Sequence, residues 1–218
     1  MTTNNYQKKW DSQTRENQKR KPKLPKPVPI DTEIKLNDNA ILLSITDTRG
    51  VIEYCNEDFV NSCGYEVHEL AGSGHNIVRH PDMPKIIFKL MWQRLKEKRN
   101  MVAFVKNLAK SGRYYWVMTD FIVKENEKGE VTHYKGIRKA APKKAINEIT
   151  PLYKKLLEIE GLKDVEASEK FLTGFLDAKN TDYDTYVEYL ISDYNDLNMF
   201  IKDNTKKGSF FKRFFGVS

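Results

Sequence analysis

The chain has 218 residues, of which 39% are hydrophobic and 31% are charged, and its formal net charge is +7. This length suits one domain of ordinary size with appended segments, and the apolar content allows a sizeable core. The sequence contains no run of about 18 apolar residues and no apolar leader, so we expect a cytoplasmic protein that neither spans a membrane nor is secreted.

The positive charges gather near both ends of the chain, while the centre is mixed in sign. Basic tails are usually solvated, and the centre has no basic stripe interleaved with aromatic residues, so no binding to nucleic acid is expected. The two cysteines, Cys55 and Cys63, form neither a CxxC pair nor a disulfide framework. This usage is typical of a compartment in which thiols stay reduced.

Composition divides the chain into four segments. Residues 1–37 are rich in Lys and Pro and poor in large apolar groups, so we expect a flexible arm. Residues 38–141 carry the patterns of a folded domain. Residues 142–205 are helical in pattern, and residues 206–218 form a basic, aromatic tail.

The folded domain begins with a predicted β-hairpin. The run AILLSITDTRGVIEYCN holds two short β-rich segments around Asp47-Thr48-Arg49-Gly50, where the glycine can take the positive φ of a tight turn. Short helical pieces follow in NEDFVNSCGYEVHELAG, with Asn56 as the predicted N-cap. The run PKIIFKLMWQRLKEKRN then places four apolar residues at helical spacing: Ile87, Leu90, Met91 and Leu95.

Three strand-like runs complete the domain: MVAFVKNLA, RYYWVMTDFIV and VTHYKGIR. The turns between them contain Lys110-Ser111-Gly112 and residues 125–129, both typical turn compositions. The order is therefore two strands, helices and three strands. Such an order favours an α+β domain with one antiparallel sheet and its helices on one face, and a ligand can bind under those helices.

The segment 142–205 is expected to be helical throughout. In TDYDTYVEYLISDYNDLNMFIKDN, apolar and aromatic residues recur at spacings of four and three, after the capping-box pattern Thr181-x-x-Asp184. These residues are Tyr183, Val187, Leu190, Tyr194, Leu197 and Ile201. Packing within a helical hairpin and a seam for a homodimer or a receptor both fit this pattern.

The most unusual stretch is GHNIVRHPDMP, residues 74–84. Helix capping explains part of it, because Asp82 can accept N–H groups at a helix start and Pro84 suits the first turn. Capping does not explain Arg79 and His80, and the planar fork of an arginine is well suited to phosphate oxygens. A metal site built from His75, His80 and Asp82 is the competing hypothesis, but the spacing Hx4HxD matches no zinc signature.

No GxSxG, P-loop, GxGxxG or Cys/His pattern is present. These are the usual signals of nucleophilic catalysis and of nucleotide phosphate binding. We therefore do not expect an enzyme.

Several runs together resemble the FAD-binding PAS domain of the bacterial aerotaxis receptor family, which includes cytoplasmic PAS proteins of bipartite energy-taxis systems. These runs are NAILLSITDTRGVIEYCNEDFVNSCGY, HNIVRHPDMPKIIFKLMW, VKN and KSGRYYWV, and the resemblance covers roughly residues 38–140. It implies a PAS fold, which is a five-stranded antiparallel sheet with flanking short helices, here followed by a helical segment.

The same resemblance implies FAD as the cofactor and a set of FAD-binding residues. These are Arg79, His80, Asp82, Trp92, Asn107 and Asn56. For Trp92, plain core burial is the alternative. Asn107 is predicted to lie inside a strand, and a strand-interior amide that faces a pocket needs partners for both its donor and its acceptor.

Two positions depart from known flavin patterns. Met101 stands where the family has a second tryptophan, which could loosen the pocket or shift the flavin potential. The segment in which light-sensing flavin PAS domains carry a photoreactive cysteine reads Asn76-Ile77 here. Signalling through a cysteine photo-adduct is therefore disfavoured.

The resemblance implies a redox or oxygen sensor of energy taxis. No kinase motif, methyl-accepting coiled coil or transmembrane pair follows, so we expect signalling in trans to a membrane chemoreceptor-type protein. The tail GSFFKRFFGVS suits a contact with the inner face of the membrane, a docking peptide or a segment folded back on the helices. A cofactor-free interaction module and a haem sensor with His75 or His80 as axial ligand remain the alternatives.

Overall fold

The computed structural model describes residues 8, 10, 24–193 and 195. These residues form two compact units, and each is described by itself below. The first unit runs through Met83 and resumes from Ile87 to Ala141. The second unit contains Pro84–Ile86 and the residues from Pro142 onward.

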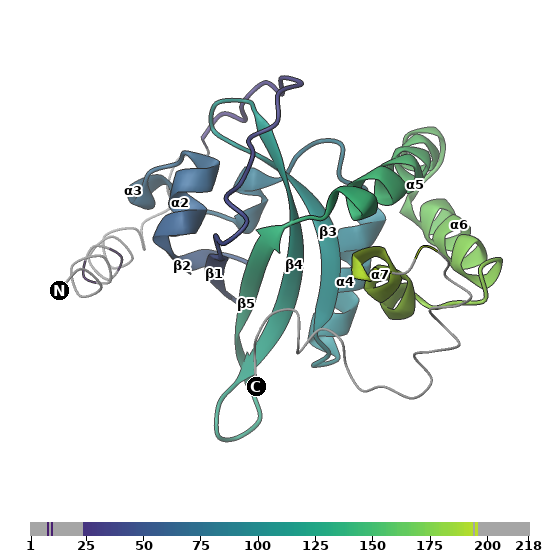
Figure 1. Ribbon diagram of the computed structural model, residues 1–218. Coiled ribbons are helices and arrows are strands. Elements are labelled where there is room, and N and C mark those ends of the chain that lie inside the picture. The colour runs from purple at the N-terminus through teal and green to yellow at the C-terminus, as the bar shows by residue number, and fades with distance from the viewer. Residues whose placement is uncertain (1–7, 9, 11–23, 194, 196–218) are drawn as a thin grey trace. The chain divides into compact units, whose positions relative to one another are not determined.

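The first unit is built on one five-stranded antiparallel sheet with the order β2-β1-β5-β4-β3 (Figure 1). The strands are β1 (Leu42–Asp47), β2 (Ile52–Cys55), β3 (Met101–Leu108), β4 (Tyr114–Glu125) and β5 (Val131–Ala140). The first strand lies beside the last one, so the sheet joins the two ends of the domain. The predicted α+β fold with a single antiparallel sheet is confirmed.

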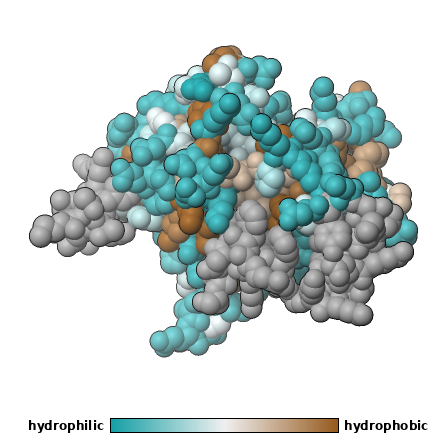
Figure 2. All heavy atoms as spheres, viewed as in Figure 1, coloured by the Kyte–Doolittle hydropathy of each residue, from teal (hydrophilic) through white to brown (hydrophobic). Residues whose placement is uncertain are grey.

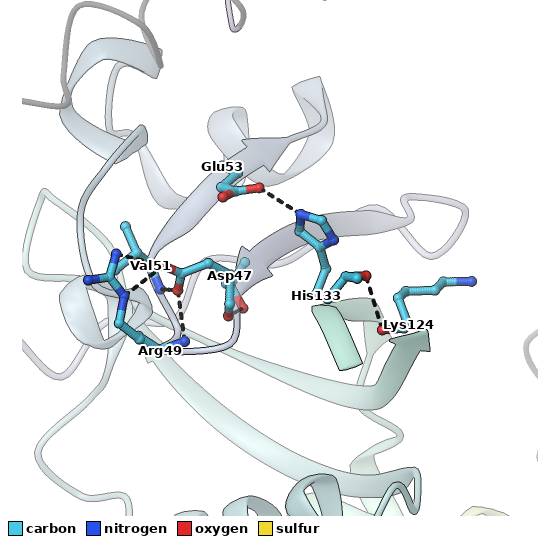
Figure 3. A network of polar contacts seen from close by, with 8 residues as sticks. Asp47, Arg49, Val51, Glu53, Lys124 and His133 are labelled. Carbon is cyan, nitrogen blue, oxygen red and sulfur yellow. Dashed lines mark hydrogen bonds and ion pairs between the residues drawn. The ribbon is translucent and has the colours of Figure 1, made fainter. Parts of the chain in front are cut away.

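The turn between β1 and β2 is closed by the side chain of Asp47. Its carboxylate accepts hydrogen bonds from the backbone N–H groups of Arg49 and Val51, both at 2.9 Å, and from Arg49 Nε at 3.0 Å (Figure 3). Burial raises the pKa of Asp47, but these hydrogen bonds outweigh burial and hold that pKa below its usual value. Gly50 has a φ of 80°, as the predicted turn requires.

Four short helical elements connect β2 to β3: α2 (Glu57–Cys63), α3 (Val67–Leu70), the 3₁₀ helix η1 (His75–Val78) and α4 (Lys85–Lys96). Asn56 is the N-cap of α2, as predicted, and Gly64 ends that helix with a φ of 70°. The predicted capping role of Asp82 is wrong: its carboxylate binds Lys106, and the N–H groups of Lys85 and Ile86 donate to Glu160.

Part of the segment expected to be a flexible arm is bound to the sheet. The Ile34 N–H donates to the Tyr114 carbonyl at 2.7 Å, and the Tyr114 N–H donates to the Thr32 carbonyl at 3.1 Å. The side chain of Trp10 is fully buried and lies 5.6 Å from the Tyr54 ring. Within the predicted arm, the backbone groups of residues 30–34 thus pair with the start of β4 and the turn before it, and such pairing offsets part of the entropy of ordering.

The second unit contains the helices α5 (Lys143–Leu162), α6 (Val165–Asp177) and α7 (Tyr183–Ile191), and α5 packs against both other helices. Tyr183, Val187 and Leu190 are buried, which accords with packing inside a helical unit. The remaining residues of the proposed seam, from position 194 on, lie outside the described residues, as does the tail 206–218.

Two details of α7 differ from the prediction. Its N-cap is Asp182, which accepts the Thr185 N–H at 2.8 Å, so the predicted capping box at Thr181 is wrong. The helix also ends at Ile191, earlier than expected. The hydroxyl of Ser192 donates to the Tyr189 carbonyl at 2.7 Å, and Lys144 Nζ binds the same carbonyl at 3.3 Å, so groups outside the helical ladder satisfy the helix end.

Hydrophilic side chains dominate the described surface in the space-filling view, and apolar ones form separate small groups (Figure 2). Val28 in the first unit and Leu162 in the second are the most exposed large apolar residues among those described, at 81% and 77%. No helix within the described ranges has both the length and the apolar character needed to cross a bilayer.

Candidate ligand-binding site

A cavity of about 380 Å³ lies inside the first unit, lined by β1, β3, β4 and β5 and by η1 and α4. This volume falls within the range of about 300–1,000 Å³ that is typical of small-molecule sites. The cavity lies on the helix-covered face of the sheet, where the sequence predicted a ligand. Its apolar walls are formed by Val78, Phe88, Met91, Leu95, Val105 and Phe121.

Three of the predicted FAD-binding residues line this cavity: Arg79, Trp92 and Asn107. The backbones of Arg79 and Asn107 form an isolated antiparallel bridge, which holds the end of η1 against β3. Arg79 Nη2 donates to the Met83 carbonyl at 2.9 Å, and the guanidinium lies 4.3 Å from the centre of the Phe88 ring. These contacts fix the arginine at the cavity wall.

Trp92 is part-buried and not a fully buried core residue. Its ring meets the Tyr134 ring edge to face at 5.6 Å, and both residues line the cavity. A Cβ atom at Gly50 would lie 3.2 Å from the Trp92 ring, so the glycine at the β1–β2 turn leaves room for the tryptophan. The turn and α4 therefore meet at one wall of the cavity.

Two polar atoms in the cavity wall have no hydrogen-bond partner among the described residues. They are Nδ2 of Asn107 and Oγ1 of Thr119, whose residues are 3% and 0% exposed. Burial raises the pKa of Tyr115 well above its usual value and the nearby Asn107 side chain lowers it, but Asn107 Nδ2 and the Tyr115 hydroxyl do not meet at hydrogen-bonding geometry. Buried polar atoms normally have partners, so a polar ligand would satisfy both.

His80 and Asp82 do not line the cavity. Nδ1 of the buried His80 accepts the Asp82 N–H at 3.1 Å, and the exposed Asp82 carboxylate lies 2.7 Å from Lys106 Nζ. Burial lowers the pKa of His80, Lys106 lowers it further, and Asp82 raises it. These contacts stabilise the loop that follows Arg79. In this structure, the two residues therefore support the loop and do not themselves face the cavity.

Asn56 is also outside the cavity lining. Its side-chain oxygen accepts the N–H groups of Phe59 at 3.1 Å and Leu43 at 2.9 Å, and its nitrogen donates to the Ile41 carbonyl. The amide thus joins α2 to β1, and all its bonds are structural. Met101, at the start of β3, is buried but does not line the cavity either.

The cavity wall also holds a polar cluster that was not predicted from the sequence, formed by Arg138, His75 and Ser44. Arg138 is 3% exposed, its Nη1 donates to Ser44 Oγ at 3.0 Å, and its Nη2 lies 3.1 Å from His75 Nε2. From the sequence, His75 is a candidate only for binding a metal or a haem iron. A signal for Arg138 was present in the sequence. The arginine follows Gly136 by two residues in a predicted strand, and the alternation of that strand places it on the inward face.

The cluster carries one positive charge. The residue His75 is part-buried, but its ring is enclosed. Burial lowers the pKa of the imidazole to about 3, and the positive charge of Arg138 contributes to this lowering. Burial also lowers the pKa of Arg138 to about 10. At neutral pH the histidine is therefore neutral and the arginine is charged. Because a guanidinium only donates, His75 Nε2 accepts and the proton is on Nδ1.

The described residues include no group of three or more His, Cys, Asp or Glu side chains placed to hold a metal ion. Of the two histidines considered for haem, His80 lies outside the cavity lining and the Nε2 of His75 is engaged by Arg138 and Ser44. The site therefore fits a ligand with hydrogen-bonding and anionic groups better than it fits a haem iron.

The first unit is similar to known proteins. Residues 52–138 match the model of the PAS fold family. The chain is 41% identical over 121 residues to the aerotaxis receptor of Escherichia coli (strain K12), which covers 56% of this chain and 24% of the receptor. It is 30% identical over 95 residues to the nitrogen fixation regulatory protein of Klebsiella pneumoniae, which covers 44% of this chain and 19% of that protein.

This chain thus matches about a quarter or less of the length of these curated relatives. Among solved structures, the dark structure of the blue-light photoreceptor Aureochrome1 LOV is 18% identical with a TM-score of 0.44, covering 55% of this chain and 86% of that one. The predicted resemblance to the aerotaxis-receptor PAS domain is confirmed by the sequence comparison. Residues 52–138 are thus similar to the PAS fold family, and this part of the chain is similar to a segment of the aerotaxis receptor.

Proposed function

We propose that the PAS domain binds FAD non-covalently in its cavity and acts as a redox or oxygen sensor of energy taxis, without catalytic activity of its own. The observation that carries this proposal is the buried, unpartnered Nδ2 of Asn107 in the cavity wall. A flavin ring presents carbonyl and ring-nitrogen acceptors, which match such a donor. The similarity to a protein named as an aerotaxis receptor supports the same function.

Three side chains of the cavity wall would hold the cofactor. Asn107 would hydrogen-bond the ring, Trp92 would contact an aromatic face or edge, and Arg79 would bind an anionic group. The bound flavin would supply a reversible change of electron and proton content. The protein's part is to exclude water, orient the ring and respond through the strands that line the cavity.

A sensor signals only if its two states differ in affinity for a partner. We propose that this partner is a membrane chemoreceptor-type protein to which the chain binds in trans, from the cytoplasm or at the inner face of the membrane. The helices after the PAS domain and the tail 206–218 are the candidate contact segments. A pull-down with oxidised and with dithionite-reduced protein measures this difference, and equal capture of the receptor in both states contradicts it.

The visible spectrum of gently purified protein tests the cofactor directly. Two flavin bands, with FAD released into the supernatant on heating, are expected. Arg79→Ala should lower FAD affinity at least about tenfold, because it removes a charged donor from the cavity wall. Arg99→Ala is the matched control, since Arg99 is an exposed arginine paired with Glu97 after α4.

Other spectra would point to other functions. A Soret band would indicate haem. Colourless protein that takes up no FAD on reconstitution would indicate a cofactor-free PAS interaction module, and the proposal of a flavin sensor would then be rejected.

A further inference from the structure

The guanidinium of Arg138 is a buried cation with only neutral partners. It donates to Ser44 Oγ at 3.0 Å, to the Gly136 carbonyl at 3.1 Å and to His75 Nε2 at 3.1 Å. It also lies 5.3 Å from the centre of the Phe59 ring. Within the part of the chain that the structure describes, no carboxylate pairs with it.

A buried charge without a counter-charge is costly, since hydrogen bonds to neutral groups replace only part of its hydration. Ser44 and His75 line the same cavity as Arg138, and they position the guanidinium without neutralising it. A negative charge in the cavity would be strongly favoured at this point. The missing counter-charge is therefore expected to come from the ligand.

Gly136 leaves room for the guanidinium of Arg138, which lies against the backbone of that glycine. A Cβ atom at Gly136 would lie 2.5 Å from Nη2 and 2.7 Å from Nη1 of Arg138. A side chain at position 136 would push the guanidinium away from its place. The glycine and the arginine thus form one local arrangement on β5.

We propose that Arg138, held by Ser44 and His75 over Gly136, binds the edge of the flavin ring that gains negative charge on reduction, and so stabilises the reduced state. This inference rests on the proposed function. Positive charge near the flavin ring is a known means of tuning its electronics. Phosphates keep their full charge in both redox states and prefer a solvated end of the site, such as that of Arg49, whose side chain is 81% exposed.

Reduction of the flavin transfers two electrons and one proton to it. A low-potential electron donor, dithionite in the experiment, loses two electrons, and the flavin takes up these two electrons and one proton. The ring then carries one net negative charge, which lies beside Arg138. Without the arginine, the reduced ring would either bind more weakly or take up a second proton.

The test is the midpoint potential of the flavin-loaded full chain. Arg138→Gln should lower the preference for reduced over oxidised flavin at least about tenfold, which for a two-electron couple is a fall of about 30 mV. Arg138→Lys should fall between Arg138→Gln and the wild type. Gly136→Ala keeps the charge but displaces it, and should also lower the potential. Lys139→Gln, one residue along β5 and outside the cavity lining, is the control and should leave the potential unchanged.

A second measurement needs no variant. Proton uptake on reduction is measured for the wild-type protein and for free FAD at a mildly acidic pH, where free FAD takes up two protons. Uptake of one proton per two electrons by the protein supports the proposal. Flavin-loaded protein that takes up two protons and has an unchanged potential in Arg138→Gln overturns it and leaves the flavin function standing. Wild-type protein that binds no flavin rejects the proposed function itself.

Discussion

The backbones of Arg79 and Asn107 pair in an antiparallel bridge, so two candidate ligand-binding side chains from separate parts of the sequence reach one cavity wall. Substitution of either side chain leaves this backbone contact available. A loss of ligand binding in such a variant can therefore be attributed to the side chain itself.

Replacement of Asn107 by leucine is expected to change stability and binding in opposite directions. The amide nitrogen is buried without a partner, and such an atom costs about 1–3 kcal/mol. Leucine has a similar shape and no polar atom, so the cofactor-free protein should gain stability in denaturant unfolding. FAD affinity should fall at least about tenfold, since the donor to the ring is lost. A variant that is destabilised without ligand would show that Asn107 has a structural partner after all.

Gly50→Ala and Gly129→Ala form a matched pair. Both glycines have positive φ, so alanine strains the backbone by a similar amount, on the order of 1 kcal/mol. At Gly50 the new methyl group would also lie 3.2 Å from the Trp92 ring, while at Gly129 the nearest atom is the flexible end of Lys98 at 3.9 Å. Gly50→Ala should lower the melting temperature more, and only this variant should change the tryptophan fluorescence. Equal effects would mean that Trp92 moves aside freely.

Asp120 on β4 should make the protein less stable as the pH rises from about 4 to 6. Burial raises its pKa from the ordinary 3.8 to about 6, although Lys135 lowers it. The folded state therefore holds a proton that the unfolded state has already released, and stability falls with rising pH in this window. Asp120→Asn removes the effect.

Urea unfolding of the Asp120→Asn variant across pH gives the check. Above pH 6 the variant should exceed the wild type by at most about 3 kcal/mol, and below pH 4 the two should agree. A constant difference at all pH values would assign the effect to packing and not to charge.

Lys106→Met and Asp82→Asn should shift the pKa of His80 in opposite directions. Lys106 lowers this pKa and Asp82 raises it, on top of the larger lowering by burial. The pKa should therefore rise in Lys106→Met and fall in Asp82→Asn, as followed by NMR titration of the imidazole protons. Shifts in the same direction would show that the loop rearranges.

The same pair of variants should differ in acid stability. The folded-state pKa of His80 lies below its unfolded value of 6.5, so stability is lost as the pH falls through this region. Lys106→Met should reduce this loss, and Asp82→Asn should increase it. Unfolding by denaturant at several pH values between 7 and 5 measures both slopes.

Local pattern was enough to predict the order of elements in the first unit. The hairpin at Gly50, the cap at Asn56 and the helix before residue 96 depend on turn chemistry, capping and periodicity, which act within a few residues. The motif around Arg79 likewise marked the loop that lines the cavity. These features are local, and the sequence alone determines them.

Other features depend on contacts between distant parts of the chain. The sequence grouped Arg79, His80 and Asp82 as one site, but the path of the backbone after η1 turns only Arg79 into the cavity lining. Arg138 on β5 meets His75 and Ser44 only because β5 pairs with β1, and no local pattern predicts this long-range pairing. Tertiary pairing, and not local propensity, thus decides which polar groups face the ligand and which charge is left for it to balance.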